Sequence, residues 1–152
     1  MIYFWDTSAI GAFLFEERFS EAIREYNKPK KALRGYISFF AEIEIESVFQ
    51  RKMNRGDFDN VERQEFRSLL KGIISNMNVI YPDAVILEQS KRMVTDYSLR
   101  SGDALQLATC KTLTSQFSEI SFLCFDEKLN KTAKAEGFEA PFLANTERQS
   151  NH

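Results

Sequence analysis

Two nearly continuous apolar runs, each followed at once by an aspartate, constrain the fold of this 152-residue chain most strongly. Ile2–Trp5 leads directly into Asp6, and residues 121–125 lead into Asp126. Strands that are apolar without alternation are typical of a parallel sheet covered by helices on both faces. An aspartate is costly to bury without a partner, so its place after such a strand indicates either a helix cap or chemistry.

The remaining patterns alternate between strands and helices, which predicts an α/β fold: a three-layer α/β/α sandwich with a central parallel sheet of about five strands. The expected strands are Ile2–Trp5, Tyr36–Ser38 and residues 79–81, 121–125 and 138–142. The last of them is an edge strand, because Pro141 has no N–H to donate within a sheet. We expect one domain over residues 1–144 and a frayed tail over residues 145–152.

Residues 39–56, FFAEIEIESVFQRKMNRG, fit two patterns. EIEIE alternates with period two, as a half-buried strand does, whereas Ile45, Val48 and Phe49 are spaced as one face of a helix. Because the alternation covers only this short segment, we predict a helix that Gly56 terminates.

Composition argues against several kinds of chemistry. The formal net charge of −2 is unlike that of a generally basic nucleic-acid binder. The single histidine, His152, is the last residue, so no histidine-based triad or metal site is expected. Cys110 and Cys124 are too few for a zinc cluster or a secreted disulfide framework, which favours the cytoplasm. No apolar run is long enough to predict a membrane span.

Four carboxylates are candidates for one site. Ligands of an open parallel sheet bind beyond the carboxyl ends of its strands, where Asp6 and Asp126 are expected. Asp103 lies at a helix start in LRSGDALQLA, and Glu44 lies beside the apolar stripe of its own helix. Gathered acids repel one another unless divalent cations neutralise them, and oxygen ligands suit Mg²⁺ or Mn²⁺. Each acid also has a purely structural interpretation, as a cap, a first-turn residue or a solvated surface residue.

Four segments taken in order, FWDTSAI, SFFAEIE, LRSGDALQLATC and FLCFDEKLNKTAKAEGF, resemble the PIN domain. They look most like the VapC-type ribonuclease toxins of bacterial toxin–antitoxin pairs, and the resemblance spans residues 2–142. It implies an α/β/α sandwich with the activity of a metal-dependent endoribonuclease. It also implies an RNA substrate, a cognate antitoxin and a homodimer.

The resemblance assigns the catalytic acids one by one to Asp6, Glu44, Asp103 and Asp126. It implies that Asp6, Asp103 and Asp126 hold Mg²⁺ or Mn²⁺. Glu44 then orients water or completes a second metal site, and its neighbours Glu42 and Glu46 remain alternatives for that role.

Two further residues are candidates for support of the acids. Many members of the family carry Thr or Ser two residues before the last acid, where this chain has Cys124, a weaker hydrogen-bond partner. Ser8 either holds an acid or a water, or caps the helix after Asp6, and helix-start preferences favour the cap. The basic residues within 28–34 and 51–55 could steer an RNA backbone or simply be solvated.

Two other functions remain open. A haloacid-dehalogenase-like phosphoryl-transfer enzyme also begins with an aspartate after its first strand, but its second aspartate two residues on is Ser8 here. A non-catalytic binding module on the same fold is the other, and the presence of all four acids argues against it. An RNA cleavage assay with metal tests the second alternative, and a phosphatase assay on small phosphate esters tests the first.

Overall fold

The computed structural model describes residues 1–30 and 35–148, and its centre is a parallel sheet with strand order β3-β2-β1-β4. The strands are β1 (Ile2–Trp5), β2 (Tyr36–Ser38), β3 (Asn78–Ile80) and β4 (Ile120–Leu123). β1 pairs with β4 along its whole length, up to Trp5 opposite Leu123. The carboxyl ends of β1 and β4 therefore lie level, at the point where the strand order reverses and where ligands bind in open α/β sheets.

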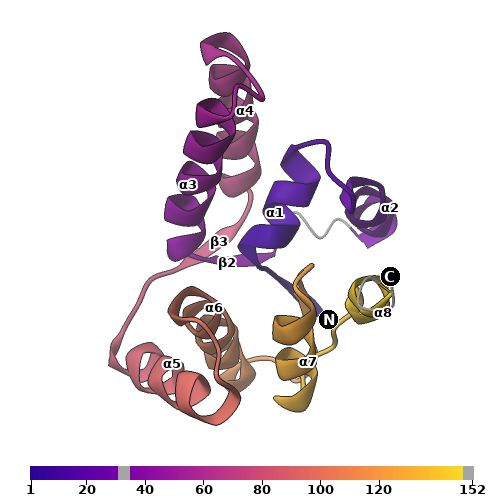
Figure 1. Cartoon of the computed structure of the whole chain (residues 1–152). Helices are drawn as coiled ribbons and strands as arrows, with labels where there is room; N and C mark the ends of the chain where they lie inside the picture. The colour runs from indigo at the N-terminus through magenta and orange to yellow at the C-terminus, as the bar shows by residue number, and fades with distance from the viewer. Residues whose placement is uncertain (31–34, 149–152) are drawn as a thin grey trace.

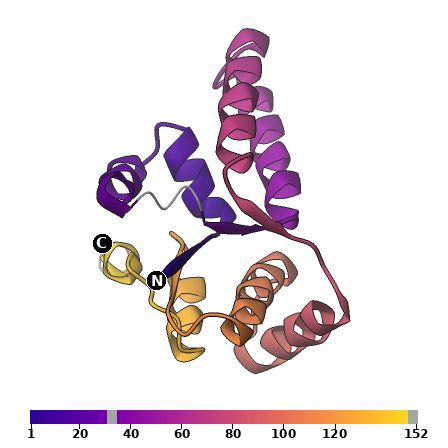
Figure 2. The same ribbon diagram turned by 180° about the vertical axis from the view of Figure 1, so that it is seen from behind.

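Helices cover both faces of the sheet, as Figures 1 and 2 show from opposite sides. One layer consists of α1 (Thr7–Leu14), α2 (Ser20–Lys30), α3 (Phe40–Asn54) and α4 (Asn60–Ile74). The other consists of α5 (Ala84–Tyr97), α6 (Ser101–Thr112), which runs on into the 3₁₀ turn η2 (Leu113–Ser115), and α7 (Glu127–Ala135). A short helix, α8 (Leu143–Glu147), follows at the sheet edge. The fold is thus the predicted three-layer sandwich on a parallel sheet.

The strands are apolar on both faces because both faces are covered. Phe4 and Phe122 are fully buried toward α5–α7, and their rings stack with centroids 5.7 Å apart. Trp5 and Leu123 are fully buried in the opposite direction, against α1–α4. Full burial of one such side chain contributes about 1.5–3 kcal/mol. The apolar runs therefore hold both helical layers onto the sheet.

The segment with two possible patterns is helical, as predicted. Residues Phe40–Asn54 form α3, and Gly56 follows its last turn with a φ of +75°, a conformation that favours glycine. Its apolar stripe is buried: Ile45 and Phe49 are both inaccessible to solvent. Tertiary burial of this stripe outweighs the short alternation of EIEIE.

The fifth strand expected at residues 138–142 is reduced to a single parallel bridge between Glu139 and Ser121. The Phe122 N–H donates to the Glu139 carbonyl at 2.8 Å, and the Glu139 N–H donates to the Ile120 carbonyl at 3.0 Å. Pro141 has no N–H with which to extend this pairing. The described sheet therefore has four strands and a one-residue extension at the β4 edge.

The helix α8 extends into residues 145–147, the start of the segment for which a frayed tail is predicted. Phe142 is buried against the rings of Tyr26 and Phe125, with centroids 5.1 and 4.5 Å away, and this contact seats α8. Residues 149–152, including His152, lie outside the described residues. Among the helices of residues 1–30 and 35–148, none has the length and apolarity needed to cross a membrane.

Candidate active site

Asp6 caps α1, and its carboxylate is nearly buried. Its backbone N–H donates to the Leu123 carbonyl at 3.0 Å, which ties it to the end of β4. Its Oδ2 accepts hydrogen bonds from the backbone N–H of Ser8 at 3.0 Å and from the Ser8 hydroxyl at 2.6 Å. Burial raises the pKa of Asp6 to about 6, although these hydrogen bonds oppose the shift, and the charges of Glu44 and Asp103 add to it.

Ser8 supports Asp6 and does not cap the helix, so the preferred interpretation of Ser8 was wrong. The N-cap of α1 is Asp6, and Ser8 is already within the first turn. Besides donating to Asp6, the Ser8 hydroxyl accepts from the backbone N–H of Phe125 at 2.9 Å. Ser8 thereby joins the ends of β1 and β4. A carboxylate at the strand end supplied the cap that the hydroxyl was expected to supply.

Asp126 caps α7 on the other side of this junction. It is exposed, and its Oδ1 accepts from the backbone N–H of Leu129 at 2.8 Å. The Asp126 backbone N–H donates to Cys124 Sγ at 3.2 Å, and Cys124 Sγ lies 3.6 Å from the Ser8 hydroxyl oxygen. Burial raises the pKa of Cys124 well above its ordinary value, so the thiol stays protonated. Cys124 therefore occupies the supporting position with weak, neutral contacts.

Glu44, on α3, presents one carboxylate oxygen to the protein and the other to the cavity. Its Oε1 accepts from the Thr7 hydroxyl at 2.7 Å and from the Gln106 amide at 2.6 Å. Its neighbours face elsewhere: Glu42 is exposed, and Glu46 pairs with Arg63 and Arg67. Of the three glutamates, Glu44 is therefore the one that lies among the other acids.

Asp103 lies in the first turn of α6 and is half-buried. Burial raises its pKa, and the charges of Asp126 and Glu44 raise it further, while Arg100 and Lys128 oppose the shift. The carboxylate is thus electrostatically coupled to acids carried by α3 and by the start of α7. Such coupling requires that these elements meet.

All four predicted acids line one cavity of about 510 Å³: Asp6, Glu44, Asp103 and Asp126. They come from the end of β1, from α3, from α6 and from the segment after β4. The same cavity is lined by Arg51, Arg100 and the half-buried ring of Phe40. Residues up to 120 positions apart in the sequence thus share one acidic cavity with two cationic side chains at its wall.

The donor chemistry of this cavity fits a hard divalent cation, because four carboxylates supply oxygen ligands and the charges of neighbouring acids add to the raised pKa of Asp6 and of Asp103. Within residues 1–30 and 35–148, however, no three His, Cys, Asp or Glu side chains stand close enough together to hold a metal ion as they are placed. The acids line a common space without enclosing a coordination sphere. To coordinate a cation together, these carboxylates would have to turn inward.

Thr7, Gly102 and Gln106 belong to the site and were not predicted as functional residues. Thr7 and Gln106 bind Glu44, and Gly102 lies against its second oxygen. One signal in the sequence could have identified Gln106: it is polar at a position of α6 that is fully buried.

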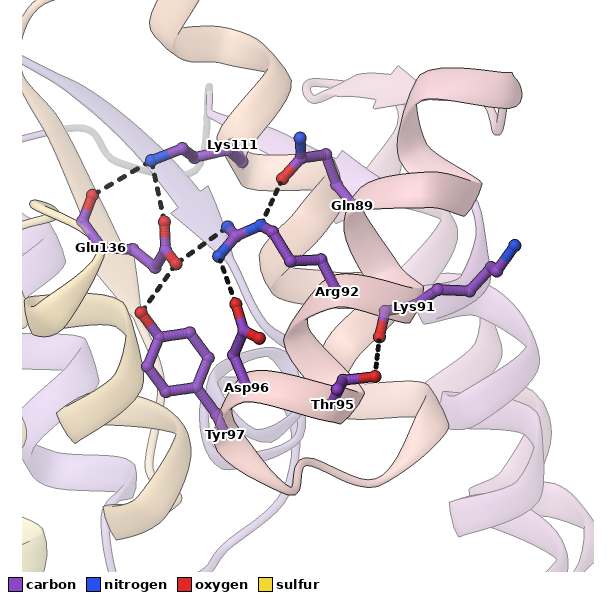
Figure 3. A network of polar contacts seen from close by, with 8 residues as sticks. All are labelled: Gln89, Lys91, Arg92, Thr95, Asp96, Tyr97, Lys111 and Glu136. Atoms are coloured by element: carbon purple, nitrogen blue, oxygen red, sulfur yellow. Dashed lines mark hydrogen bonds and ion pairs between the residues drawn. The ribbon is translucent and has the colours of Figure 1, made fainter.

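A second polar network holds the helices that carry Asp103 and Asp126 (Figure 3). Glu136, at the end of α7, accepts from Lys111 on α6 at 2.8 Å, and from Arg92 at 2.9 Å and Tyr97 at 2.8 Å, both on α5. Only 7% of its side chain is exposed. Burial alone raises the pKa of Glu136, but the three hydrogen bonds outweigh it and lower that pKa to about 2. This carboxylate stays ionised and fastens three helices together.

Comparisons with known proteins agree with this architecture. A family model described as the PIN domain matches residues 3–135. A chain of a toxin–antitoxin complex from Klebsiella pneumoniae has a similar structure, with a TM-score of 0.59 and 23% sequence identity. The similarity covers 91% of this chain and 97% of that chain, and it is a likeness of fold. The comparison with curated proteins gave no match.

Proposed function

The chain belongs to the PIN domain family, and we propose that it is a metal-dependent endoribonuclease, the toxin of a type II toxin–antitoxin pair. PIN domains are generally nucleases. One observation carries the proposal: the four carboxylates line a single cavity beside the carboxyl ends of β1 and β4, which end next to each other. A site of this kind suits hydrolysis of a phosphodiester, because it can concentrate divalent cations around a negatively charged substrate.

Asp6, Asp103 and Asp126 hold the cation, Mg²⁺ or Mn²⁺, in this proposal. When bound, the ion lowers the pKa of water and stabilises the charge that develops on the phosphate. Ser8 keeps Asp6 in place through two hydrogen bonds to Oδ2. Glu44, which lines the same cavity, orients the attacking water or completes a second metal site. No protein nucleophile and no histidine are needed.

Within the basic segment 51–55, Arg51 is the residue best placed to contact the RNA backbone. It lines the cavity, whereas Lys52 pairs with Glu17 and Arg55 pairs with Asp57 on the outer surface. Of the other basic segment, residues 31–34 lie outside the described residues. A phosphate contact away from the reacting centre contributes uniform binding, which affects KM rather than kcat.

The matched variants Arg51→Ala and Arg55→Ala test this contact. We expect Arg51→Ala to raise KM for RNA with little change in kcat, and to reduce the slope of log affinity against log salt by about 0.7. Arg55→Ala should leave both unchanged. Equal effects of the two variants would contradict a specific contact at Arg51.

The proposed partners are a cognate antitoxin and a second copy of this chain. The likeness to a chain of the Klebsiella pneumoniae toxin–antitoxin complex supports the first. An apolar groove on α5 and α6, lined by Ile86, Leu87, Val94 and Leu105, supports the second. Both cysteines are free thiols, which is consistent with the cytoplasm as the proposed compartment.

Metal removal tests the proposed activity directly. Purified protein is incubated with RNA in Mg²⁺ or Mn²⁺, with EDTA, and with the metal restored after EDTA. We expect cleavage only in the first and third samples. Cleavage that persists in EDTA would contradict metal dependence. Faster hydrolysis of small phosphate esters than of RNA would favour a phosphoryl-transfer enzyme of the haloacid-dehalogenase kind, and no hydrolysis of either would favour a binding module.

A further inference from the structure

A buried polar network fixes one oxygen of Glu44 from behind the cavity. Gln106 Nε2 donates to Glu44 Oε1 at 2.6 Å and also lies 3.0 Å from the Thr7 hydroxyl. The Thr7 hydroxyl donates to the same Glu44 oxygen at 2.7 Å. Since an ionised carboxylate only accepts hydrogen bonds, both neighbours must present donors to it. The amide of Gln106 is therefore held with its nitrogen toward Glu44.

This arrangement leaves the carbonyl oxygen of Gln106 buried without a partner among the described residues. Its neighbours on α6, Ala104, Leu107 and Ala108, are apolar and equally buried. An apolar side chain at position 106 would avoid the cost of a buried, unpaired oxygen. Departures of this kind from the local pattern are expected where function requires them. The hydrogen bonds that Gln106 Nε2 donates to Glu44 and Thr7 explain why a glutamine occupies this position.

The second oxygen of Glu44 is left for the cavity. A Cβ placed on Gly102 would lie 3.4 Å from Glu44 Oε2 and 3.3 Å from a ring carbon of Phe40. The carboxylate thus lies directly against the start of α6, in a gap that only glycine leaves fully open. One oxygen is held by Thr7 and Gln106, and the other lies beside Gly102 at the cavity wall.

We propose that Gln106 and Thr7 are positioning residues that hold Glu44 in its reactive orientation, an inference that rests on the proposed function. Thr7 directly follows Asp6, and Gln106 lies about one turn after Asp103 on α6. The network therefore joins three of the segments that carry the acids. It supplies the attraction that keeps a glutamate beside two like charges.

The test compares Gln106→Met and Thr7→Val with the wild type, at a temperature where every variant is folded. We expect kcat for RNA cleavage in Mn²⁺ to fall about 10- to 100-fold in each, as for other residues that orient a catalytic ligand. The KM for RNA should not change. The Tm of Gln106→Met should change little, because removal of the unpaired oxygen offsets loss of the hydrogen bond to Glu44. Thr7→Ser keeps the hydroxyl and should retain activity.

Thr109→Val is the matched control, since Thr109 lies on the same helix, is 1% exposed and donates its hydroxyl to the Leu105 carbonyl. It should leave kcat unchanged. Wild-type kcat in Gln106→Met would overturn the proposal, and so would activity that falls only in proportion to a lowered Tm.

An NMR measurement separates this inference from the proposed function. The side-chain amide protons of Gln106 should exchange slowly with water in the wild type and rapidly in Glu44→Ala. Slow exchange in a protein that cleaves no RNA would overturn the proposed function and leave the network intact. Fast exchange in the wild type would overturn the network, whatever the activity.

Discussion

At the scale of single residues, the fold buries Asp6, and this burial disfavours the charged form of its carboxyl group. Asp6 is 5% exposed, and its pKa of about 6 means that the carboxyl is only partly ionised in mildly acidic solution. Two hydrogen bonds from Ser8 favour the anion but do not offset its burial. An approaching cation would stabilise this buried charge, which is the physical reason to regard Asp6 as more than a cap.

Asp6→Asn should stabilise the metal-free protein above pH 6. The folded pKa lies above the unfolded value, so the wild type loses stability as pH rises from about 4 through 6, by at most about 3 kcal/mol. Asparagine retains the cap and carries no charge. Thermal melts in EDTA at pH 5 and pH 7.5 measure the effect: the gain in Tm should be larger at pH 7.5. An equal or smaller gain there would contradict the account of Asp6.

The four acids could be predicted because each stands in a local context: two follow apolar strands, and two lie in helical motifs. The residues that hold Glu44 could not, because Thr7 and Gln106 are 37 and 62 positions away from it in the sequence. Ser8 was misassigned for a related reason. Its hydroxyl accepts a hydrogen bond from the backbone N–H of Phe125, 117 residues away, and no local preference indicates such a contact.

At the scale of elements, the helices α5, α6 and α7 depend on Glu136 for their mutual placement. The strands and most helices could be predicted, because their hydrophobic periods are local properties of the sequence. The length of the last strand could not, since it depends on how far Pro141 lets the chain follow β4. The position of α8 could not be predicted either, because it depends on tertiary contacts of Phe142 with Tyr26 and Phe125.

Glu136→Gln should destabilise the fold by about 2 kcal/mol at pH 7, because Arg92 and Lys111 lose their shared counter-charge. The folded pKa of Glu136 lies below the unfolded value, so its contribution is present above pH 4.5 and is lost as pH falls toward 2. Urea unfolding at pH 7 and pH 3 measures both effects. The difference between wild type and variant should shrink at pH 3, and a constant difference would contradict this account.

At the scale of the whole molecule, two surfaces with exposed apolar side chains are candidates for the homodimer interface. Leu87 and Val94, which are 57% and 41% exposed, line the groove on α5 and α6. Leu69, which is also 57% exposed, lies on the outer side of α4. The proposed homodimer uses the groove, because its lining is more apolar than the surface around Leu69 and Val61.

Leu87→Glu should convert the proposed homodimer into a monomer, because a charge in the groove has to be desolvated on association. Leu69→Glu, a change of the same residue type at the same exposure, should leave the dimer intact. Light scattering over a range of protein concentrations measures both. A wild type that remains monomeric at high concentration would rule out the dimer, and dissociation by Leu69→Glu would place its interface elsewhere.

The central claim, that the four acids form a metal-dependent site for RNA cleavage, is tested most directly by Asp103→Asn. Asparagine preserves the size of the side chain and suits the first turn of α6, but it removes the charge that binds a cation. The measurement is the rate of RNA cleavage in Mn²⁺, with thermal melts on the same samples. The account predicts loss of cleavage by a factor of about 100 or more at an unchanged or raised Tm. Full activity in the folded variant would contradict it, and Asp103 would then be only a residue at a helix start.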